Sequence, residues 1–327
     1  MTIQTFASDQ EVRWCPGCGN YAVLAAVQRL LPKLGLMKEN IVFISGIGCA
    51  SRFPYYMDTY GFHTIHGRAT SIATGLKLTR PELSVWVVIG DGDGLSIGLG
   101  HLLHLIRRNI DVNILLLNNQ IYGLTKGQFS PTTNIDQVTV TSPYGTLDEP
   151  FNPLSLALVA NCGFVARAID IDTKRLTQVL TQAYAYPGTT FIEILQNCHI
   201  YHDNAFSIYT NKSVQNERCI FLECDKSLRF GKKKDKGLTW DHQNLQITKN
   251  ITDQNQHKLI QHRPSEQLST LQLLLAKMSY PEYPVGIGVF RCAERNTHEA
   301  LSTKQKNKHS LRSLKEILNS GQSWKVY

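Results

Sequence analysis

Runs of apolar residues recur through the first two thirds of the chain, and they are too short to be helices. Residues 85–89 (VWVVI) and 112–117 (VNILLL) are two such runs, and others occupy residues 41–45, 164–169 and 190–195. Strands that are buried on both faces of a parallel sheet have this near-continuous apolar pattern. We therefore predict a buried parallel strand in each of these segments.

The segments between these runs have apolar residues at helical spacing instead. They are residues 21–34, a helix that starts at 69, and residues 95–108, 153–161 and 173–186. Strands that alternate with helices indicate an α/β fold, here a doubly wound, mostly parallel sheet. The loops at the carboxyl ends of such strands meet at one edge, where α/β proteins bind ligands.

The last third of the chain has a weaker pattern. Residues 202–255 have no regular pattern of apolar positions. A helix is predicted at 267–278 and a strand at 285–290, and a polar, lysine-rich tail follows from Glu294 onward. We expect an α/β domain at residues 1–200 and an irregular C-terminal extension at 201–327, packed on the first domain or on a partner subunit. The tail is expected to be mobile or to lie over another subunit.

Composition narrows the class of protein. The 327 residues, 42% of them hydrophobic, are enough for a full core, and no run of about 18 uncharged apolar residues indicates a membrane span. The first residues lack the basic and apolar regions of a secretory signal, so we expect a cytoplasmic protein without membrane attachment. The net charge of +8 suits an acidic protein partner. No pattern typical of nucleic-acid binding is present.

The turn after residues 85–89 carries the first candidate chemistry. Asp91 follows that strand, and Asn119 follows the next one, so both oxygens can face one crevice. Together with a nearby main-chain carbonyl such as that of Ile121, they form an oxygen set suited to Mg²⁺ carrying a diphosphate. The glycines of the turn, Gly90, Gly92 and Gly94, would let the backbone approach phosphate oxygens. The alternative is an ordinary strand-turn-helix connection with an aspartate cap.

This arrangement resembles the GDG…NN signature of thiamine diphosphate enzymes, in which the aspartate, the last asparagine and the carbonyl two residues later hold the metal. Residues 121–132 (IYGLTKGQFSPT) and 46–69 are similar to the β subunit of 2-oxoacid:ferredoxin oxidoreductases, and the resemblance covers residues 12–200. It implies a sheet of the thiamine-diphosphate-binding type, with Mg²⁺ held by Asp91, Asn119 and Ile121. The residues implied to contact the cofactor are Ile47, Gly48, Cys49, Ala50, His66, Gly67, Arg68, Ala69, Gly90, Asp91, Gly92, Asp93, Asn119, Ile121, Gly123 and Leu124.

The eight cysteines indicate metal or redox chemistry rather than a disulfide framework. Cys15 and Cys18 form a Cys-x2-Cys turn, which alternatively fits a zinc knuckle or a dithiol pair. Cys49 lies in a glycine-rich turn at the same sheet edge as Asp91, where it is either a small buried residue or a third ligand. A [4Fe-4S] cluster needs four thiolates.

The fourth ligand must come from far along the chain, and the candidates are Cys162, Cys198, Cys219, Cys224 and Cys292. Cys198 follows the strand 190–195, whereas Cys162 precedes a strand and should lie at the opposite edge. The resemblance also favours Cys198, because the family has a Gln-x-Cys-Pro segment where this chain has Gln196 to Cys198, followed by His199 instead of proline. A separate metal held by Cys219 and Cys224 is an alternative, but these two cysteines lack nearby partner ligands in the sequence.

Candidate substrate residues lie around the same edge. Arg52, three residues beyond Cys49, can grip a second carboxylate, which 2-oxoglutarate has and pyruvate lacks. By resemblance, Leu124 and Lys126 border the substrate pocket, and His66 donates to a phosphate or a substrate oxygen. His63 is interpreted as a structural residue. A solvated or structural role is the alternative for Arg52.

The resemblance implies the oxidative decarboxylation of a 2-oxoacid to acyl-CoA and CO2, with electrons passed through [4Fe-4S] to ferredoxin and coenzyme A as co-substrate. The expected 2-oxoacid is 2-oxoglutarate. Pyruvate and branched 2-oxoacids are alternative substrates. A non-redox thiamine-dependent decarboxylase and a non-catalytic electron-transfer subunit are alternative functions. Only one diphosphate-binding unit fits into the chain, so a heterodimer with a larger α subunit, which supplies the second thiamine-binding domain, is expected.

Overall fold

The centre of the protein is an eight-stranded sheet, seen in a computed structural model that describes residues 6–241, 244–252, 256–267, 270–308, 313–322 and 324. The strand order is β2-β1-β3-β4-β6-β5-β11-β7. The strands are β1 (Ile41–Ser45), β2 (Tyr60–His63), β3 (Ser84–Gly90), β4 (Asn113–Asn118), β5 (Phe164–Ile169), β6 (Thr190–Leu195), β7 (Cys219–Leu222) and β11 (Val285–Cys292).

Strands β1 to β6 are mutually parallel, and only β11 and β7 run in the opposite direction. The predicted class, a doubly wound and mostly parallel α/β sheet, is therefore confirmed. The carboxyl ends of β1, β3, β4, β5 and β6 lie at a single edge. Loops that are far apart in the sequence meet there.

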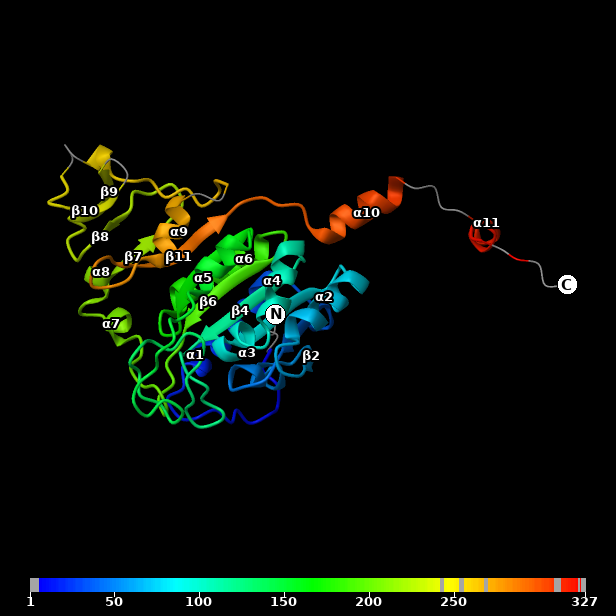
Figure 1. Cartoon of the computed structure of the whole chain (residues 1–327), viewed down its shortest axis with the longest axis horizontal. Helices are drawn as coiled ribbons and strands as arrows, with labels where there is room; N and C mark the ends of the chain where they lie inside the picture. Colours follow the sequence, from blue (N-terminus) through cyan, green and yellow to red (C-terminus); the bar gives the residue numbers. More distant parts are fainter. Residues whose placement is uncertain are drawn as a thin grey trace.

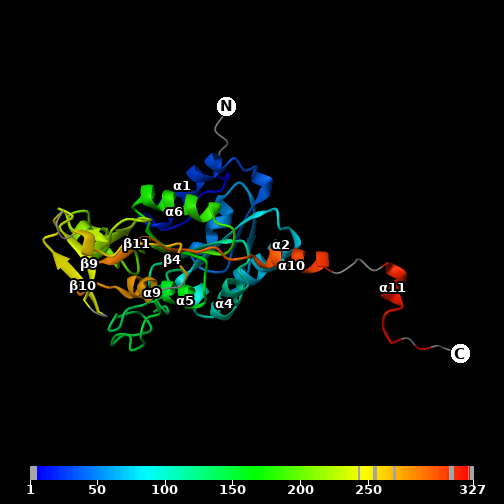
Figure 2. The same cartoon turned by 90° about the horizontal axis from the view of Figure 1, so that it is seen from above.

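Helices cover both faces of this sheet, as Figure 2 shows with β4 between two layers. One face is covered by α2 (Ala69–Thr79), α4 (Leu99–Arg108), α5 (Pro153–Val159) and α9 (Thr270–Lys277), and the other by α1 (Asn20–Leu30), α6 (Thr173–Ala185) and the 3-10 helix η3 (Ala50–Tyr56). Alternate strand residues, such as Val87 and Val88, belong to the two separate cores. This explains why the strands lack polar positions along most of their length.

The helix predicted at residues 95–108 is interrupted. The structure has a short helix α3 (Asp91–Leu95) and then α4, with a break at residues 96–98. A Cβ atom on Gly98 would lie 2.5 Å from the Asp93 carbonyl oxygen and 3.0 Å from Gly67 Cα. The break lets the loop before α2 pack directly on the turn after β3.

The C-terminal extension contains more regular structure than its sequence pattern indicates. Strands β7 and β11 extend the main sheet, and β8 (Arg229–Phe230), β9 (Lys236–Asp241) and β10 (Asn244–Lys249) form a second, antiparallel sheet. The short helices α7 (Ser207–Thr210) and α8 (Gln215–Arg218) connect the parts, and 3-10 turns occur at η1 (Leu31–Leu34), η2 (Lys38–Asn40) and η4 (Gln256–Lys258). Strands this short leave little periodicity in a sequence.

The chain ends in α10 (His298–Lys308) and α11 (Leu314–Leu318), which lead away from the sheet in Figure 1. Residues 268–269 of the predicted helix 267–278, and parts of the tail, lie outside the described residues. That the tail is mobile or lies on another subunit stays a prediction. No helix among the described residues is long and apolar enough to cross a membrane.

Candidate active site

The carboxyl edge of the sheet brings together most of the residues that the sequence indicated. Asp91 is the first residue of α3, directly after β3, and Asn119 directly follows β4, the strand paired with β3. The turn with Cys49 follows β1, and Cys198 follows β6. The crossover topology thus places the oxygen ligands and the cysteines on the same side of the molecule.

The Asp91 carboxylate is buried and held by hydroxyl groups. Its Oδ2 atom accepts hydrogen bonds from Ser130 Oγ at 2.6 Å and Thr132 Oγ1 at 2.7 Å. Burial raises the pKa of Asp91, while these hydrogen bonds and the backbone N–H of Asn119 lower it. A bound cation would offset the cost of burying the charge.

Asn119 and Ile121 lie in a tight turn. The side-chain oxygen of Asn119 accepts from the Ile121 N–H at 3.2 Å, and its amide nitrogen donates to Gln196 Oε1 at 2.9 Å. Gln120, between the two predicted ligands, has a left-handed backbone with φ of 59°. A carboxylate, an amide oxygen and a main-chain carbonyl are hard oxygen donors, so this set fits Mg²⁺ chemically.

The glycines of the turn after β3 also allow close packing within the protein. A Cβ on Gly92 would lie 2.1 Å from Tyr122 Cε1, and one on Gly94 would lie 2.7 Å from Ile89 Cδ1. The space at these two glycines is therefore occupied by the protein's own side chains. A Cβ on Gly90 would have no neighbouring atom closer than 4.0 Å, so the space at this glycine is open.

Asp93 ties the two neighbouring loops together. Its Oδ1 atom accepts from the N–H groups of Gly67 at 2.8 Å and Ile47 at 3.2 Å. Burial raises the pKa of Asp93, against the lowering effect of these two N–H groups. His66 and Arg68 flank Gly67 on the exposed side, and Arg68 Nη1 contacts His101. Asp93 thus holds the predicted cofactor loops 47–50 and 66–69 against the turn after β3.

The four predicted cluster cysteines lie within electrostatic range of one another. Cys18 interacts with Cys49, Cys198 and Cys15, and Cys49 interacts with Cys198 and Cys15. Gly123 lies between two of them, because a Cβ there would be 3.4 Å from Cys198 Sγ and 3.8 Å from Cys49 Sγ. The gathering of four thiols from three loops fits a [4Fe-4S] cluster in donor type and number.

Burial raises the pKa of Cys18 to about 12 and that of Cys49 to about 11, with the neighbouring cysteines adding to the effect. Among the described residues, no three His, Cys, Asp or Glu side chains are close enough to hold a single metal ion. A four-iron cluster takes one thiolate on each iron, so its ligands are not grouped around a single ion.

The other cysteines lie elsewhere. Cys162 is buried before β5, and its thiol contacts the carbonyl oxygens of Phe164 and Thr189, at the opposite sheet edge as predicted. Cys219 is buried in β7. Cys292 lies within electrostatic range of Cys224, which is not one of the four predicted cluster cysteines.

Gln196 connects the oxygen ligands with the cysteines. This buried side chain accepts from Asn119 Nδ2 at 2.9 Å and donates to Cys18 Sγ at 3.4 Å. The sequence identified Gln196 only as part of a motif. Gln196 directly follows β6, and this position makes it a bridge between the two candidate sites.

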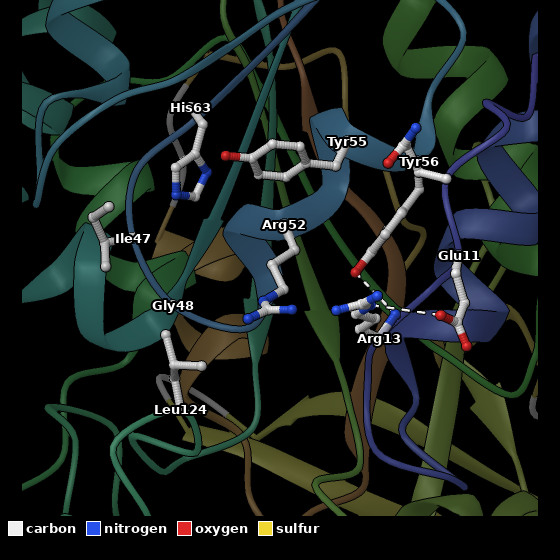
Figure 3. A pocket seen from close by; sticks show the side chains of 10 residues that line it. Glu11, Arg13, Ile47, Gly48, Arg52, Tyr55, Tyr56, His63 and Leu124 are labelled. Carbon is white, nitrogen blue, oxygen red and sulfur yellow. Dashed lines mark hydrogen bonds and ion pairs between the residues drawn. The ribbon is translucent and has the colours of Figure 1, made fainter.

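A cavity of about 510 Å³ opens beside these residues (Figure 3). Its walls are formed by Gln10, Glu11, Arg13, Ile47, Gly48, Arg52, Tyr55, Tyr56, His63 and Leu124. Arg52 extends into it between Leu124 and Arg13. Of the residues that the sequence assigned to the substrate pocket, Arg52 and Leu124 line the cavity, whereas His66 and Lys126 are exposed and do not.

His63 lines the cavity, although the sequence favoured a structural role for it. Its Nδ1 atom lies 2.8 Å from the Ser51 carbonyl oxygen, which can only accept, so this nitrogen carries the hydrogen. The centre of the His63 ring lies 5.3 Å from the centre of the Tyr55 ring. Neither the cavity position of His63 nor that of Arg13 had a sequence signal, because each depends on how two loops meet.

Comparison with known proteins indicates the same class of enzyme as the sequence motifs. Residues 46–194 match the family described as thiamine pyrophosphate enzyme, C-terminal TPP binding domain. The fold and the match together define the chain as a thiamine-diphosphate-binding enzyme chain of the α/β type.

More specific relatives match larger parts of the chain. The chain is 48% identical over 301 residues to the 2-oxoglutarate oxidoreductase subunit KorB of Mycobacterium tuberculosis, covering 92% of this chain and 80% of the relative. It is 43% identical over 214 residues to subunit beta of 2-oxoacid:ferredoxin oxidoreductase 1 of Aeropyrum pernix, covering 65% of this chain and 66% of the relative. The structure of 2-oxoglutarate:ferredoxin oxidoreductase from Magnetococcus marinus, with 2-oxoglutarate, coenzyme A and succinyl-CoA bound, matches with a TM-score of 0.78 at 28% identity, covering 99% of this chain and 98% of that chain.

The chain belongs to the β subunits of the thiamine-diphosphate-dependent 2-oxoacid:ferredoxin oxidoreductases. The sequence-based assignment of family and enzyme class is therefore confirmed. Membership as a β subunit implies an α-subunit partner.

Proposed function

We propose that this chain is the β subunit of a 2-oxoglutarate:ferredoxin oxidoreductase, which converts 2-oxoglutarate and coenzyme A to succinyl-CoA and CO2. The choice of 2-oxoglutarate as substrate rests on Arg52. Its positive charge reaches into the cavity, whose wall includes Ile47 and Gly48 of the turn that carries Cys49. A relative and a solved structure with 2-oxoglutarate in their names support it. The α subunit would complete the cofactor site, and ferredoxin would accept the electrons.

Different residues of the chain would bind the metal ion, the diphosphate and the cluster. Asp91, Asn119 and the Ile121 carbonyl would hold Mg²⁺, and Gly90 leaves room for the diphosphate. Cys15, Cys18, Cys49 and Cys198 would hold the [4Fe-4S] cluster, which would serve as a one-electron carrier. Thiamine diphosphate, when bound, supplies the electron sink for decarboxylation. The side chains of this chain orient the substrate and restrict access of water to it.

Arg52 and His63 present two kinds of polar group to the substrate. A guanidinium binds a carboxylate with two parallel hydrogen bonds. His63 has its Nδ1 hydrogen committed to Ser51, so in the neutral ring Nε2 is the acceptor. Leu124 forms an apolar wall that would contact the methylene groups of a 2-oxoacid.

The proposed setting is a cytoplasmic complex. All eight cysteines are free thiols in the structure, as is typical of proteins in a reducing compartment. The four thiols of the candidate cluster come from exposed or half-buried loops, where an oxidising environment would compete with iron for them.

The function can be tested anaerobically on the chain co-expressed with its α subunit. Viologen reduction is followed with thiamine diphosphate, Mg²⁺ and coenzyme A, and with 2-oxoglutarate, pyruvate or branched 2-oxoacids. We expect reduction with a preference for 2-oxoglutarate. A preference for pyruvate would refute the substrate, and no reduction by any 2-oxoacid, with iron and cofactor bound, would favour a non-redox thiamine-dependent enzyme.

Replacing Arg52 with glutamine should change the substrate preference. A hydrogen bond to a charged group contributes about 1.5–3 kcal/mol, so kcat/KM for 2-oxoglutarate should fall roughly 10- to 150-fold. The value for pyruvate, which lacks the second carboxylate, should change little. Steady-state viologen reduction with both substrates measures this.

The control is Arg13→Gln. Arg13 lines the same cavity, but its side chain is 73% exposed and pairs with Glu11 at 3.5 Å. An exposed pair of this kind contributes little, so its removal should leave the preference for 2-oxoglutarate unchanged. Equal losses for both substrates in Arg52→Gln would show that Arg52 is structural.

A further inference from the structure

A buried ion pair lies inside the sheet, away from the cavity. Arg167 on β5 and Glu193 on β6 are Cα partners in the parallel ladder, and Arg167 Nε donates to Glu193 Oε2 at 2.7 Å. The two side chains are only 8% and 2% exposed. The Arg167 guanidinium also lies 5.8 Å from the centre of the Phe290 ring. Neither residue has a role in the sites described above.

A hydrogen-bonded path runs from this pair to Asp91. The other carboxylate oxygen of Glu193 accepts from Asn118 Nδ2 at 2.8 Å. This bond fixes the Asn118 amide so that its oxygen faces Thr132 Oγ1, at 2.9 Å, and Thr132 Oγ1 is 2.7 Å from Asp91 Oδ2. The hydroxyl has one proton for two acceptors, and Ser130 Oγ is a second donor to the same Asp91 oxygen.

The same asparagine also supports the second half of the candidate metal site. Asn118 Oδ1 accepts from the N–H of Gln120 at 3.2 Å. Gln120 has a φ of 59°, a conformation that residues other than glycine adopt rarely and that needs support from its surroundings. The Asn118 side chain therefore stabilises the turn that presents Asn119 and the Ile121 carbonyl.

Stability alone is a poor explanation for this arrangement. A buried ion pair costs desolvation energy, and well-packed apolar residues of similar volume are often as stable or more stable. Every member of the path, Arg167, Glu193, Asn118, Thr132 and Asp91, is buried when the whole residue is considered, with an exposed fraction of at most 7%. The path also ends at Asp91 rather than at the surface. Outer partners that orient metal ligands are built in this way.

We propose that the Arg167–Glu193 pair is a positioning unit for the Mg²⁺–diphosphate site, acting through Asn118 on Asp91 and on the turn 119–121. This inference rests on the proposed function, because it takes Asp91 and Asn119 as the metal ligands. Arg167 holds the Glu193 carboxylate in place, Glu193 orients the Asn118 amide, and the amide oxygen orders Thr132 and Gln120. Neither Arg167 nor Glu193 lines the cavity.

The test is a double variant, Arg167→Met with Glu193→Leu, in the αβ complex. It removes both charges together, so no uncompensated charge stays buried. We expect a folded complex whose dissociation constants for thiamine diphosphate and for Mg²⁺ rise about 10- to 100-fold, the usual effect of losing an outer partner of a metal ligand. Calorimetric titration measures both constants, and kcat at saturating cofactor and metal should change much less.

The matched control is Thr190→Val. Thr190 Oγ1 donates to Asn113 Oδ1 at 2.9 Å, joining the same two strands, β6 and β4, at the opposite edge of the sheet. This variant loses a buried hydroxyl bond to an asparagine but should bind thiamine diphosphate and Mg²⁺ like the wild type. Cofactor affinity in the double variant within twofold of this control would overturn the proposal.

A second variant keeps the proposal testable if the double variant does not fold. Thr132→Val breaks the path between Asn118 and Asp91, whereas Thr132→Ser keeps the hydroxyl. The valine variant should lose about tenfold or more in Mg²⁺ affinity, with recovery in the serine variant, and equal affinity in both would contradict the inference. Asp91→Asn distinguishes failure of this inference from failure of the proposed metal site. Wild-type cofactor binding in that variant would refute the metal site itself.

Discussion

Replacing Asp91 with alanine is expected to abolish binding of thiamine diphosphate with Mg²⁺ while leaving the iron content unchanged. Asp91 is the only carboxylate in the proposed ligand set, and it is buried at the end of β3. A metal ion contributes several kcal/mol of charge stabilisation, and each 1.36 kcal/mol is a factor of ten in rate. Viologen reduction should therefore fall at least about 100-fold. Cofactor binding is measured by calorimetry, and the cluster by iron analysis and visible absorbance.

Two further variants show whether the charge itself is required. Asp91→Asn keeps an oxygen near Ser130 and Thr132 but has no charge, so it should fail like alanine. Asp111→Asn is the control, because Asp111 precedes β4 at the opposite edge, where it pairs with Lys77 at 2.8 Å. Turnover that survives in Asp91→Ala would favour a non-catalytic electron-transfer subunit.

Replacing Cys198 with alanine is expected to remove or damage the cluster. Cys198 is the only one of the four gathered thiols that comes from the second half of the chain, and Cys18 and Cys49 both lie within electrostatic range of it. A [4Fe-4S] centre takes four thiolates, so iron should fall from about four per β chain to well under half of that. Viologen reduction should be lost with it, whereas binding of thiamine diphosphate should persist.

The control for this variant is Cys224→Ala. Cys224 is an exposed free thiol in the extension, and the four gathered cysteines do not interact with it. Its replacement should leave iron content and absorbance as in the wild type. Intact iron and absorbance in Cys198→Ala would show that another residue supplies the fourth ligand.

The sequence by itself determined the central strands of the sheet and the edge at which the chemistry lies. Strands such as 85–89 and 190–195 are buried on both faces, so their apolar pattern is continuous and local. Once they are parallel, the residues that follow them must share an edge, and this placed Asp91, Asn119, Cys49 and Cys198 together. The same rule placed Cys162 at the opposite edge.

Tertiary structure decided what depends on close approach between distant segments. The break before α4 exists because Gly98 packs on Gly67, and the glycine at position 92 accommodates the Tyr122 ring. His63 and Arg13 reach the cavity only because separate loops meet there. The pattern of apolar and polar residues along the chain does not predict such contacts. Each contact joins two segments that are distant in the sequence, and the local pattern does not place one segment relative to the other.

The Arg167–Glu193 pair illustrates the same limit within the core. In the sequence, each is a single charged residue interrupting an apolar strand, with no sign of a partner. The parallel register of β5 with β6 and of β6 with β4 brings Arg167, Glu193 and Asn118 onto one hydrogen-bonded path. Local periodicity therefore fixes the strands and the edge on which the ligands lie, whereas register and loop packing fix which side chains support them.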